Sequence, residues 1–144
     1  MSIYVREFNP SDWPFIRKYA TPIPCYDTCG VVCFDPITGH FLAAMLFDQL
    51  SDTSASVHIC IPHMRAIKHG FLEIAFQYAF EKLKRVVLYG VVPASNSKAV
   101  NFAKRCGGTE LIRLKDGFSI GVDNVLLEMR LVDCRFYQNF KEAA

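Results

Sequence analysis

The chain has 144 residues, of which 51% are hydrophobic and 21% charged, and its formal net charge is +2. This balance excludes extended disorder, and the charge is too small to predict a nucleic-acid or anionic-membrane partner by itself. The length is that of one domain, large enough to build a hydrophobic core without disulfides.

The first third of the sequence predicts a strand over 3–8 and a helix over 11–20, capped by its first serine. The Thr-Pro-Ile-Pro run at 21–24 ends that helix. Residues 31–35 and 40–48 are apolar and are separated by a Pro-Ile-Thr-Gly segment, which favours a turn. We therefore expect these two segments to form a β-hairpin.

The middle of the sequence changes from strand to helix and back. Residues 54–61 alternate between a polar face, which carries His58 and two serines, and an apolar face, so they predict a strand. Apolar residues at helical spacing predict a helix over 71–83. Residues 85–92 predict a further strand, and their near-continuous apolar character predicts that both of its faces are covered.

The last third predicts one helix and a strand pair. The helix begins at 93–96 and is ended by the glycines at 107–108. Residues 109–114 and 125–132 are expected to form an antiparallel pair around a loop at 115–118.

This order of elements predicts an α/β (α+β) fold, in which helices flank a mixed sheet. We expect one domain over residues 1–144, with a C-terminal tail at about 133–144 whose last residues, 139–144, are loose.

The first residues are charged and the sequence contains no run of about 18 apolar residues, so neither a secretory signal nor a membrane span is expected. The six cysteines are therefore interpreted as reduced thiols of a cytoplasmic protein. Cys25, Cys29 and Cys33 lie four residues apart, but this spacing matches none of the usual zinc patterns, so we expect no metal.

A basic loop precedes the helix predicted at 71–83: residues 61–71 read IPHMRAIKHGF. A helix start presents free backbone N–H groups and partial positive charge, and both bind phosphates. Arg65 and Lys68 add full charges that suit a pyrophosphate, and Gly70 lets the backbone approach a ligand. The alternative is a solvated loop whose charges bind nothing specific.

Two segments resemble motifs of the GNAT superfamily of N-acyltransferases. Residues 65–70 resemble its Q/R-x-x-G-x-G/A signature, with Lys68 in place of the first glycine, between a strand and a helix as in the family. Asn96, Ala99 and Gly107 match residues that recur after the family's fifth strand. The order of elements over 1–132 is also similar.

The resemblance implies a mostly antiparallel, twisted sheet whose fourth and fifth strands splay apart and hold an acyl-CoA. It implies that the pantetheine arm lies along the fourth strand and that the diphosphate binds at the basic loop, with further contacts from the segment after the fifth strand. The implied cofactor-binding residues are Ile59, Cys60, Ile61, Arg65, Ala66, Ile67, Lys68, His69, Gly70, Phe71, Asn96 and Lys98.

The activity that the resemblance implies is acetyl-CoA-dependent transfer of an acyl group to an amine of a protein or small molecule. Many relatives use a tyrosine as general acid at the position of Ala103, so the alternative is a non-catalytic CoA-binding protein that regulates a partner. Cys106 lies nearby, but we interpret it as a small apolar helix residue. His58 is the candidate base, because a histidine titrates near neutrality; a hydrogen-bonded sheet histidine is the competing interpretation.

Other partners receive less support. A nucleic-acid module would use scattered basic residues, but the chain has neither a basic excess nor a known reading motif. Phe136, Tyr137 and Phe140, which follow the last strand, suggest either a homodimer or packing of the tail against its own domain.

Overall fold

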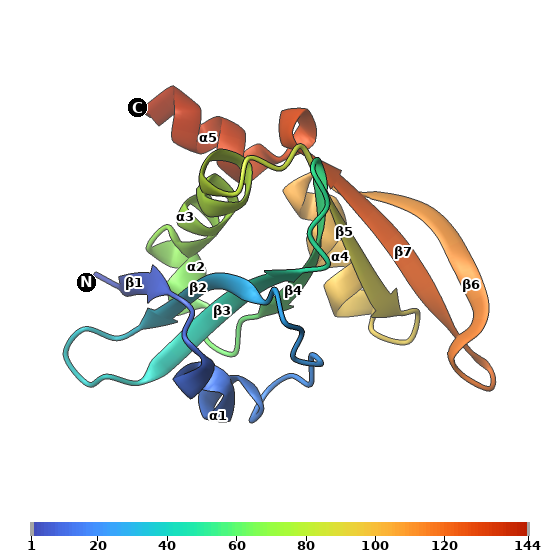
Figure 1. The fold of residues 1–144 in the computed structure, drawn as a ribbon, viewed down its shortest axis with the longest axis horizontal. Coiled ribbons are helices and arrows are strands. Elements are labelled where there is room, and N and C mark those ends of the chain that lie inside the picture. Colours follow the sequence, from blue (N-terminus) through green and yellow to red (C-terminus); the bar gives the residue numbers. More distant parts are fainter. Residues whose placement is uncertain (1, 144) are drawn as a thin grey trace.

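A seven-stranded mixed sheet with the order β1-β2-β3-β4-β5-β7-β6 runs through the molecule (Figure 1). The computed structural model describes residues 2–143. Parallel pairing occurs between β4 and β5, and the other neighbouring strands pair antiparallel. The predicted mixed, mostly antiparallel sheet is therefore confirmed. The strands are β1 (Tyr4–Glu7), β2 (Cys29–Phe34), β3 (Phe41–Asp48), β4 (Ser54–Cys60), β5 (Val87–Pro93), β6 (Thr109–Ser119) and β7 (Val122–Arg130).

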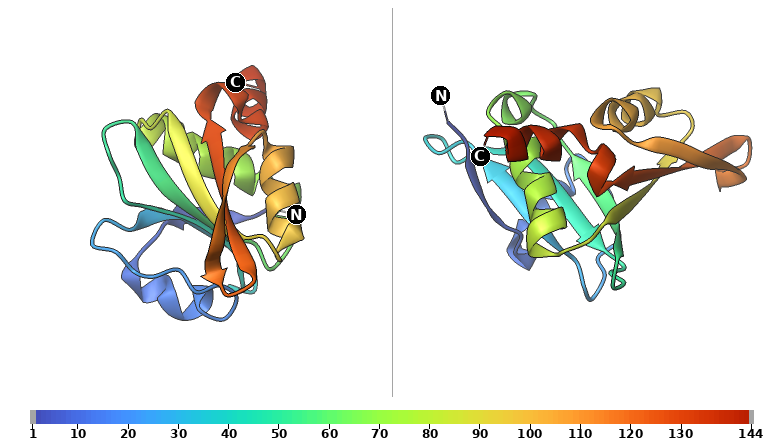
Figure 2. Two further views of the ribbon diagram at one scale, coloured as in Figure 1. Left: turned by 90° about the vertical axis from the view of Figure 1, so that its right-hand side faces the viewer. Right: turned by 90° about the horizontal axis from the view of Figure 1, so that it is seen from above.

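The helices cover the two faces of the sheet unequally (Figure 2). A short α1 lies on one face, and α3, α4 and α5 lie on the other. Three short turns, η1 (Pro10–Asp12), η2 (Tyr78–Lys82) and η3 (Leu131–Asp133), adjoin the helices. The helices are α1 (Trp13–Ile16), α2 (Arg65–Lys68), α3 (Phe71–Gln77), α4 (Ser97–Cys106) and α5 (Arg135–Ala143).

Two hydrophobic cores follow from this arrangement. The larger core lies between the sheet and α3, where Phe71 and Phe76 pack with Phe47 of β3. The smaller core lies beneath α1, where Trp13 and Ile16 pack against β2 and β3. The alternation of side chains along β3 supplies both cores, which explains why all eight of its residues are buried.

The first helix is shorter than predicted. It ends at Ile16, and Asn9 caps the preceding turn by accepting a hydrogen bond from the Ser11 N–H at 3.0 Å. Arg6 of β1 anchors this segment through two hydrogen bonds to the buried Asp12, at 2.7 and 2.8 Å. The ion pair between Arg6 and Asp12 thus fixes the start of this segment, whose own helix propensity is too weak to extend the helix further.

The predicted helix at 71–83 is confirmed in part. The α-helical portion, α3, ends at Gln77, and the chain continues as a π-helical turn in which the Leu83 N–H donates to the Tyr78 carbonyl at 2.9 Å. The basic loop before it contains a further turn of helix, α2, that the sequence did not predict.

The prediction of a loop at 115–118 is wrong, because β6 continues through these residues to Ser119. The hairpin turns instead at Ile120 and Gly121, and Gly121 has a φ of +83°, a conformation that glycine adopts readily. The tip of the long β6–β7 hairpin extends beyond the helices (Figure 1). The prediction that both faces of the strand at 85–92 are covered is confirmed in part. The neighbours Val87 and Leu88 of β5 are buried on opposite faces, but Val91 further along the strand is exposed.

The prediction that residues 139–144 form a loose tail is also wrong for residues 139–143. Residues up to Ala143 belong to α5, which packs on α3, while residue 144 lies outside the described part of the chain. Phe136 stacks on Phe76 with ring centroids 6.4 Å apart, and the Tyr137 hydroxyl donates to Glu81 at 3.0 Å. Of the two alternatives for these aromatics, the structure supports packing against their own domain; the Phe140 side chain is outside the described residues. No helix within residues 2–143 is both long and apolar enough to cross a membrane.

Gly107, which ends α4, should be essential for stability. Its φ is +112°, and a Cβ built there would lie 1.9 Å from the Asp133 carbonyl oxygen. We expect Gly107→Ala to lower the free energy of unfolding by at least about 2 kcal/mol in urea titration. Gly39→Ala is the matched control, because φ is +74° there but no atom lies within 4 Å, and it should cost about 1 kcal/mol. Equal losses in both variants would contradict this account.

Candidate active site

The central feature of the molecule is the parting of β4 and β5. These parallel strands pair through three residue pairs, Ser54 with Val87, Ala55 with Leu88 and Ser56 with Tyr89. Both strands then continue, to Cys60 and Pro93, without pairing with each other. Backbone groups on the two facing edges beyond this point are left without a strand partner.

A cleft of about 680 Å³ occupies this opening and is lined from both faces of the sheet. On the α4 side its walls include Val57 and Ile59 of β4 and Val92 of β5, and on the α1 side they include His58 and Val91. Alternate residues of a strand point to opposite faces, so each diverging strand contributes to both sides. A cleft of this size and largely apolar lining is typical of a small-molecule site.

The start of α3 follows β4 through the short helix α2, and Gly70 and Phe71 are not among the residues that line the cleft. Gly70 precedes the helix with a φ of +92°, no side chain caps the helix, and a Cβ built at Gly70 would meet no atom within 4 Å. Ala66 is fully buried and Ile67 packs on the core, and their backbone N–H groups donate to the carbonyls of His63 and Met64 at 3.1 and 3.0 Å. Lys68 is exposed.

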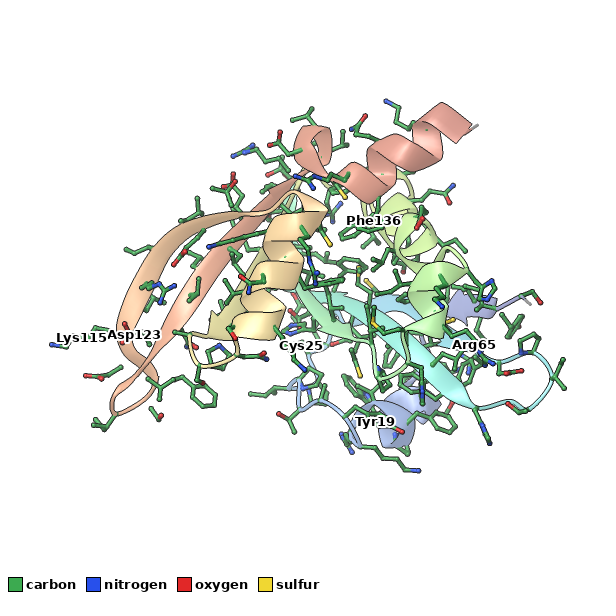
Figure 3. The ribbon with its side chains drawn as sticks, turned by 180° about the vertical axis from the view of Figure 1, so that it is seen from behind. Tyr19, Cys25, Arg65, Lys115, Asp123 and Phe136 are labelled. Carbon is green, nitrogen blue, oxygen red and sulfur yellow. The ribbon has the colours of Figure 1, made fainter. Side chains whose placement is uncertain are left out.

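Arg65 is used differently from the expectation that its charge serves a phosphate. Its guanidinium forms an ion pair with the buried Asp35 at the end of β2, on the side of the molecule away from the hairpin residues Lys115 and Asp123 (Figure 3). The backbone N–H groups of Thr38 and Ile37, and then Arg65, lower the pKa of Asp35 to about 2. Arg65 therefore ties α2 to the β2–β3 turn, and its backbone remains the part available to a ligand.

The start of α4 forms the opposite wall. The Asn96 Oδ1 accepts a hydrogen bond from the Ala99 N–H at 3.2 Å, so Asn96 is the cap of this helix. Asn96 and Lys98 both line the cleft, as do Ala99 and Ala103 further along the helix. The spacing of Asn96 and Ala99, which contributed to the family resemblance, is thus that of a helix cap and the N–H it binds.

His58 and Asp48 form a pair at the α1 side of the cleft. The His58 Nε2 lies 2.9 Å from the Asp48 Oδ2, with side-chain exposures of 38% and 4%. The Asp48 Oδ1 is buried and has no hydrogen-bond partner within the described residues. A carboxylate in this position orients the imidazole ring and stabilises positive charge on it. His58 is therefore a histidine that is both hydrogen-bonded and open to the cleft.

Asp48 was missed in the sequence, because nothing in the spacing of residues 48 and 58 marks a pair. The β3–β4 register places Leu46 opposite His58 and Asp48 opposite Ser56, so the two side chains are diagonal neighbours on one face. The strands at 40–48 and 54–61 were both predicted from the sequence, but their pairing, which brings residues 48 and 58 to one face, was not.

The cleft offers no tyrosine among the described residues that line it. Cys106 lines it one turn after Ala103, but burial raises the pKa of its thiol to about 12. Such a thiol is too weak an acid to protonate a departing thiolate, whose own pKa is about 8.5. Cys106 is fully buried in the larger core, in agreement with the apolar role expected for it.

The fold is shared with solved N-acetyltransferases. Spermidine/spermine N-acetyltransferase SpeG from Vibrio cholerae, in complex with manganese ions, superimposes with a TM-score of 0.74 at 17% identity over 99% of this chain and 98% of that one. Spermidine N-acetyltransferase from the same organism, in complex with CoA and spermine, gives a TM-score of 0.70 at 18% identity over 92% and 97%. No family model and no curated protein matches the sequence. The chain therefore has the GNAT fold that its motifs predicted.

The Asp35–Arg65 pair should appear in the acid limb of the stability curve. The ionised form of Asp35 is favoured in the folded state, so its contribution is present above pH 3.8 and is lost as the pH falls towards about 2. We expect Asp35→Asn to be less stable than the wild type at neutral pH and to show a weaker pH dependence across that window, measured by urea unfolding. Asp52→Asn, in an exposed turn, is the control; parallel curves for both variants would exclude this role.

Proposed function

We propose that residues 1–144 form one catalytic unit that transfers an acetyl group from acetyl-CoA to the amine of a protein or small molecule. The observation that carries the proposal is the parting of β4 and β5 beside an uncapped helix start, with an imidazole–carboxylate pair on the far side of the cleft. The shared fold supports it, because a structural neighbour is described as a complex with CoA and spermine.

The residues present fit a CoA. Unpaired backbone of β4 near Ile59, Cys60 and Ile61 would hold the pantetheine arm, and the loop from Arg65 to Phe71 would hold the diphosphate. The N–H groups of residues 66–70 already donate to carbonyls within the loop, so the N–H groups of Arg65 and Phe71 would make the backbone contacts. Asn96 would contact the arm and Lys98 a phosphate. Bound there, acetyl-CoA supplies the acetyl group as a thioester.

His58 is proposed as the base that takes a proton from the acceptor amine. An amine must be neutral to attack, and a positioned imidazole contributes typically about 10²–10⁴-fold in rate. Asp48 holds the ring through Nε2, which leaves the other ring nitrogen as the atom that would take the proton. The missing tyrosine is tolerable, because a thiolate is a weak base and leaves without a strong acid.

Binding of CoA is tested by calorimetric titration of the wild type, Gly70→Trp and Gly39→Trp. Gly70 and Gly39 both have positive φ and open surroundings, but only Gly70 lies at the start of α3. We expect CoA binding to be lost in Gly70→Trp, because the indole would cover the helix start, and kept in Gly39→Trp. Equal heats in all three proteins, or no heat in the wild type, would count against this pocket.

The role of His58 is tested by the rate of CoA release as a function of pH, with acetyl-CoA and a panel of amines. His58→Ala should lower kcat by about 10²-fold or more and remove the low-pH limb of the profile, while CoA binding is unchanged. Asp48→Asn should lower kcat less, because the ring remains but loses its orientation.

His40→Ala, at an exposed turn, is the control for that experiment and should resemble the wild type. An unaltered profile in His58→Ala would remove His58 from the mechanism. CoA binding by the wild type without turnover on any amine would instead favour the non-catalytic alternative, which the cleft-facing histidine argues against.

A further inference from the structure

The half of the sheet beyond the cleft has an uncovered apolar face. Val91 of β5 pairs with Leu126 of β7, which pairs with Ile112 of β6, and Leu114 lies two residues further along β6. We call these four residues the apolar strip. Val91, Ile112 and Leu114 are 56%, 53% and 43% exposed, and α4 covers the opposite face of the same strands.

The apolar strip is continuous with the reaction side of the cleft. Val91 itself lines the cleft. Ser56 of β4 pairs with Tyr89 of β5, so parity places Val91 on the same face as His58. Across the cleft, Thr21 and Pro22 form the facing wall, and Ile23 beside them is exposed. An acceptor that reaches His58 from this side therefore passes over apolar surface.

The carboxylates around this entrance are already engaged. Glu128 lies 2.8 Å from the Arg130 guanidinium, and Asp48 is paired with His58. Asp27 accepts hydrogen bonds from the backbone N–H groups of residues 49 and 50, at 3.2 and 2.9 Å. A polyamine carries several positive charges, each of which needs a carboxylate or water. The entrance instead offers one imidazole–carboxylate pair followed by apolar surface.

From this arrangement we infer that the acceptor is a peptide whose free α-amino group is followed by apolar side chains, rather than a polyamine. The inference rests on the proposed function and names its substrate class. The strip crosses three strands, about 10 Å at the usual strand spacing, which about three extended residues span. The amino group would reach His58 while the next side chains cover the strip.

The reaction balances with groups already named. His58 takes one proton from the α-ammonium, the neutral amine nitrogen bonds to the acetyl carbon, and the carbon–sulfur bond of the thioester breaks. The electron pair of that bond remains on sulfur. The released thiolate takes up the second proton, which the nitrogen loses as it becomes an amide, to give the free thiol of CoA.

The test compares three acceptors: a peptide amide with a free N-terminus and apolar residues at positions two to four, its counterpart with lysines at those positions, and spermidine. Binding to the CoA-saturated protein is measured by calorimetry, and CoA release from acetyl-CoA is measured in parallel. We expect the apolar peptide to exceed both others by at least about 10-fold in affinity and in kcat/KM. A preference for spermidine or for the lysine peptide would overturn the inference while leaving the proposed function standing.

A pair of variants locates the contact. Ile112→Lys adds a charge to the strip and should lower kcat/KM for the apolar peptide by at least about 10-fold without altering CoA binding. Ile37→Lys changes an isoleucine that is 80% exposed in the distant β2–β3 turn and should leave both measurements unchanged. Equal activity of the two variants would refute the strip as the acceptor surface. Peptide binding that depends on Ile112 but gives no CoA release would instead refute the proposed function and keep the strip as a peptide-binding surface.

Discussion

The separation of β4 from β5 is the constraint on which the rest of the structure depends. Parallel strands normally satisfy each other's backbone groups, and leaving those groups unpaired costs free energy. Here each strand is secured on its outer edge: β3 pairs with β4 as far as Cys60, and β7 pairs with β5 as far as Pro93. The opening is therefore a fixed gap between two anchored strands, and its unpaired edges are the groups that a ligand can satisfy.

Regular elements were predictable from the sequence wherever local pattern and tertiary environment agree. β3, β4 and α4 lie close to their expected ranges, because their apolar spacing is strong and their ends carry turn or capping residues. The errors lie where tertiary contacts decide. The C-terminal helix is held by aromatic contacts with α3, and β6 continues through a Lys-Asp-Gly segment because the side chains of Asp123 and Asn124 in β7 bind its backbone.

The candidate site also contains some features that the local sequence predicts and others that depend on tertiary contacts. Residues near one another in sequence, such as those from Arg65 to Phe71, were recognisable as a group, although the ion pair of Arg65 with Asp35 was not. The pairing of His58 with Asp48 depends on the register of two strands, and single-sequence patterns do not specify register. A side-chain pair that forms across a hairpin can therefore be recognised only when the pairing of its two strands is known.

The same fold supports different acceptors, because specificity lies in the surfaces that adjoin the shared cleft. In this chain the sequence of β5 is apolar on both faces, yet only one face has a helix on it. Isolated exposed side chains such as Ile37 are ordinary, but a continuous strip that begins inside a cleft is a feature that binding sites share. The apolar side chains of β5 therefore serve two purposes: one face packs in the fold, and the other is available to the acceptor that we infer. This explains why the sequence of β5 resembles that of a buried strand although one of its faces is partly exposed.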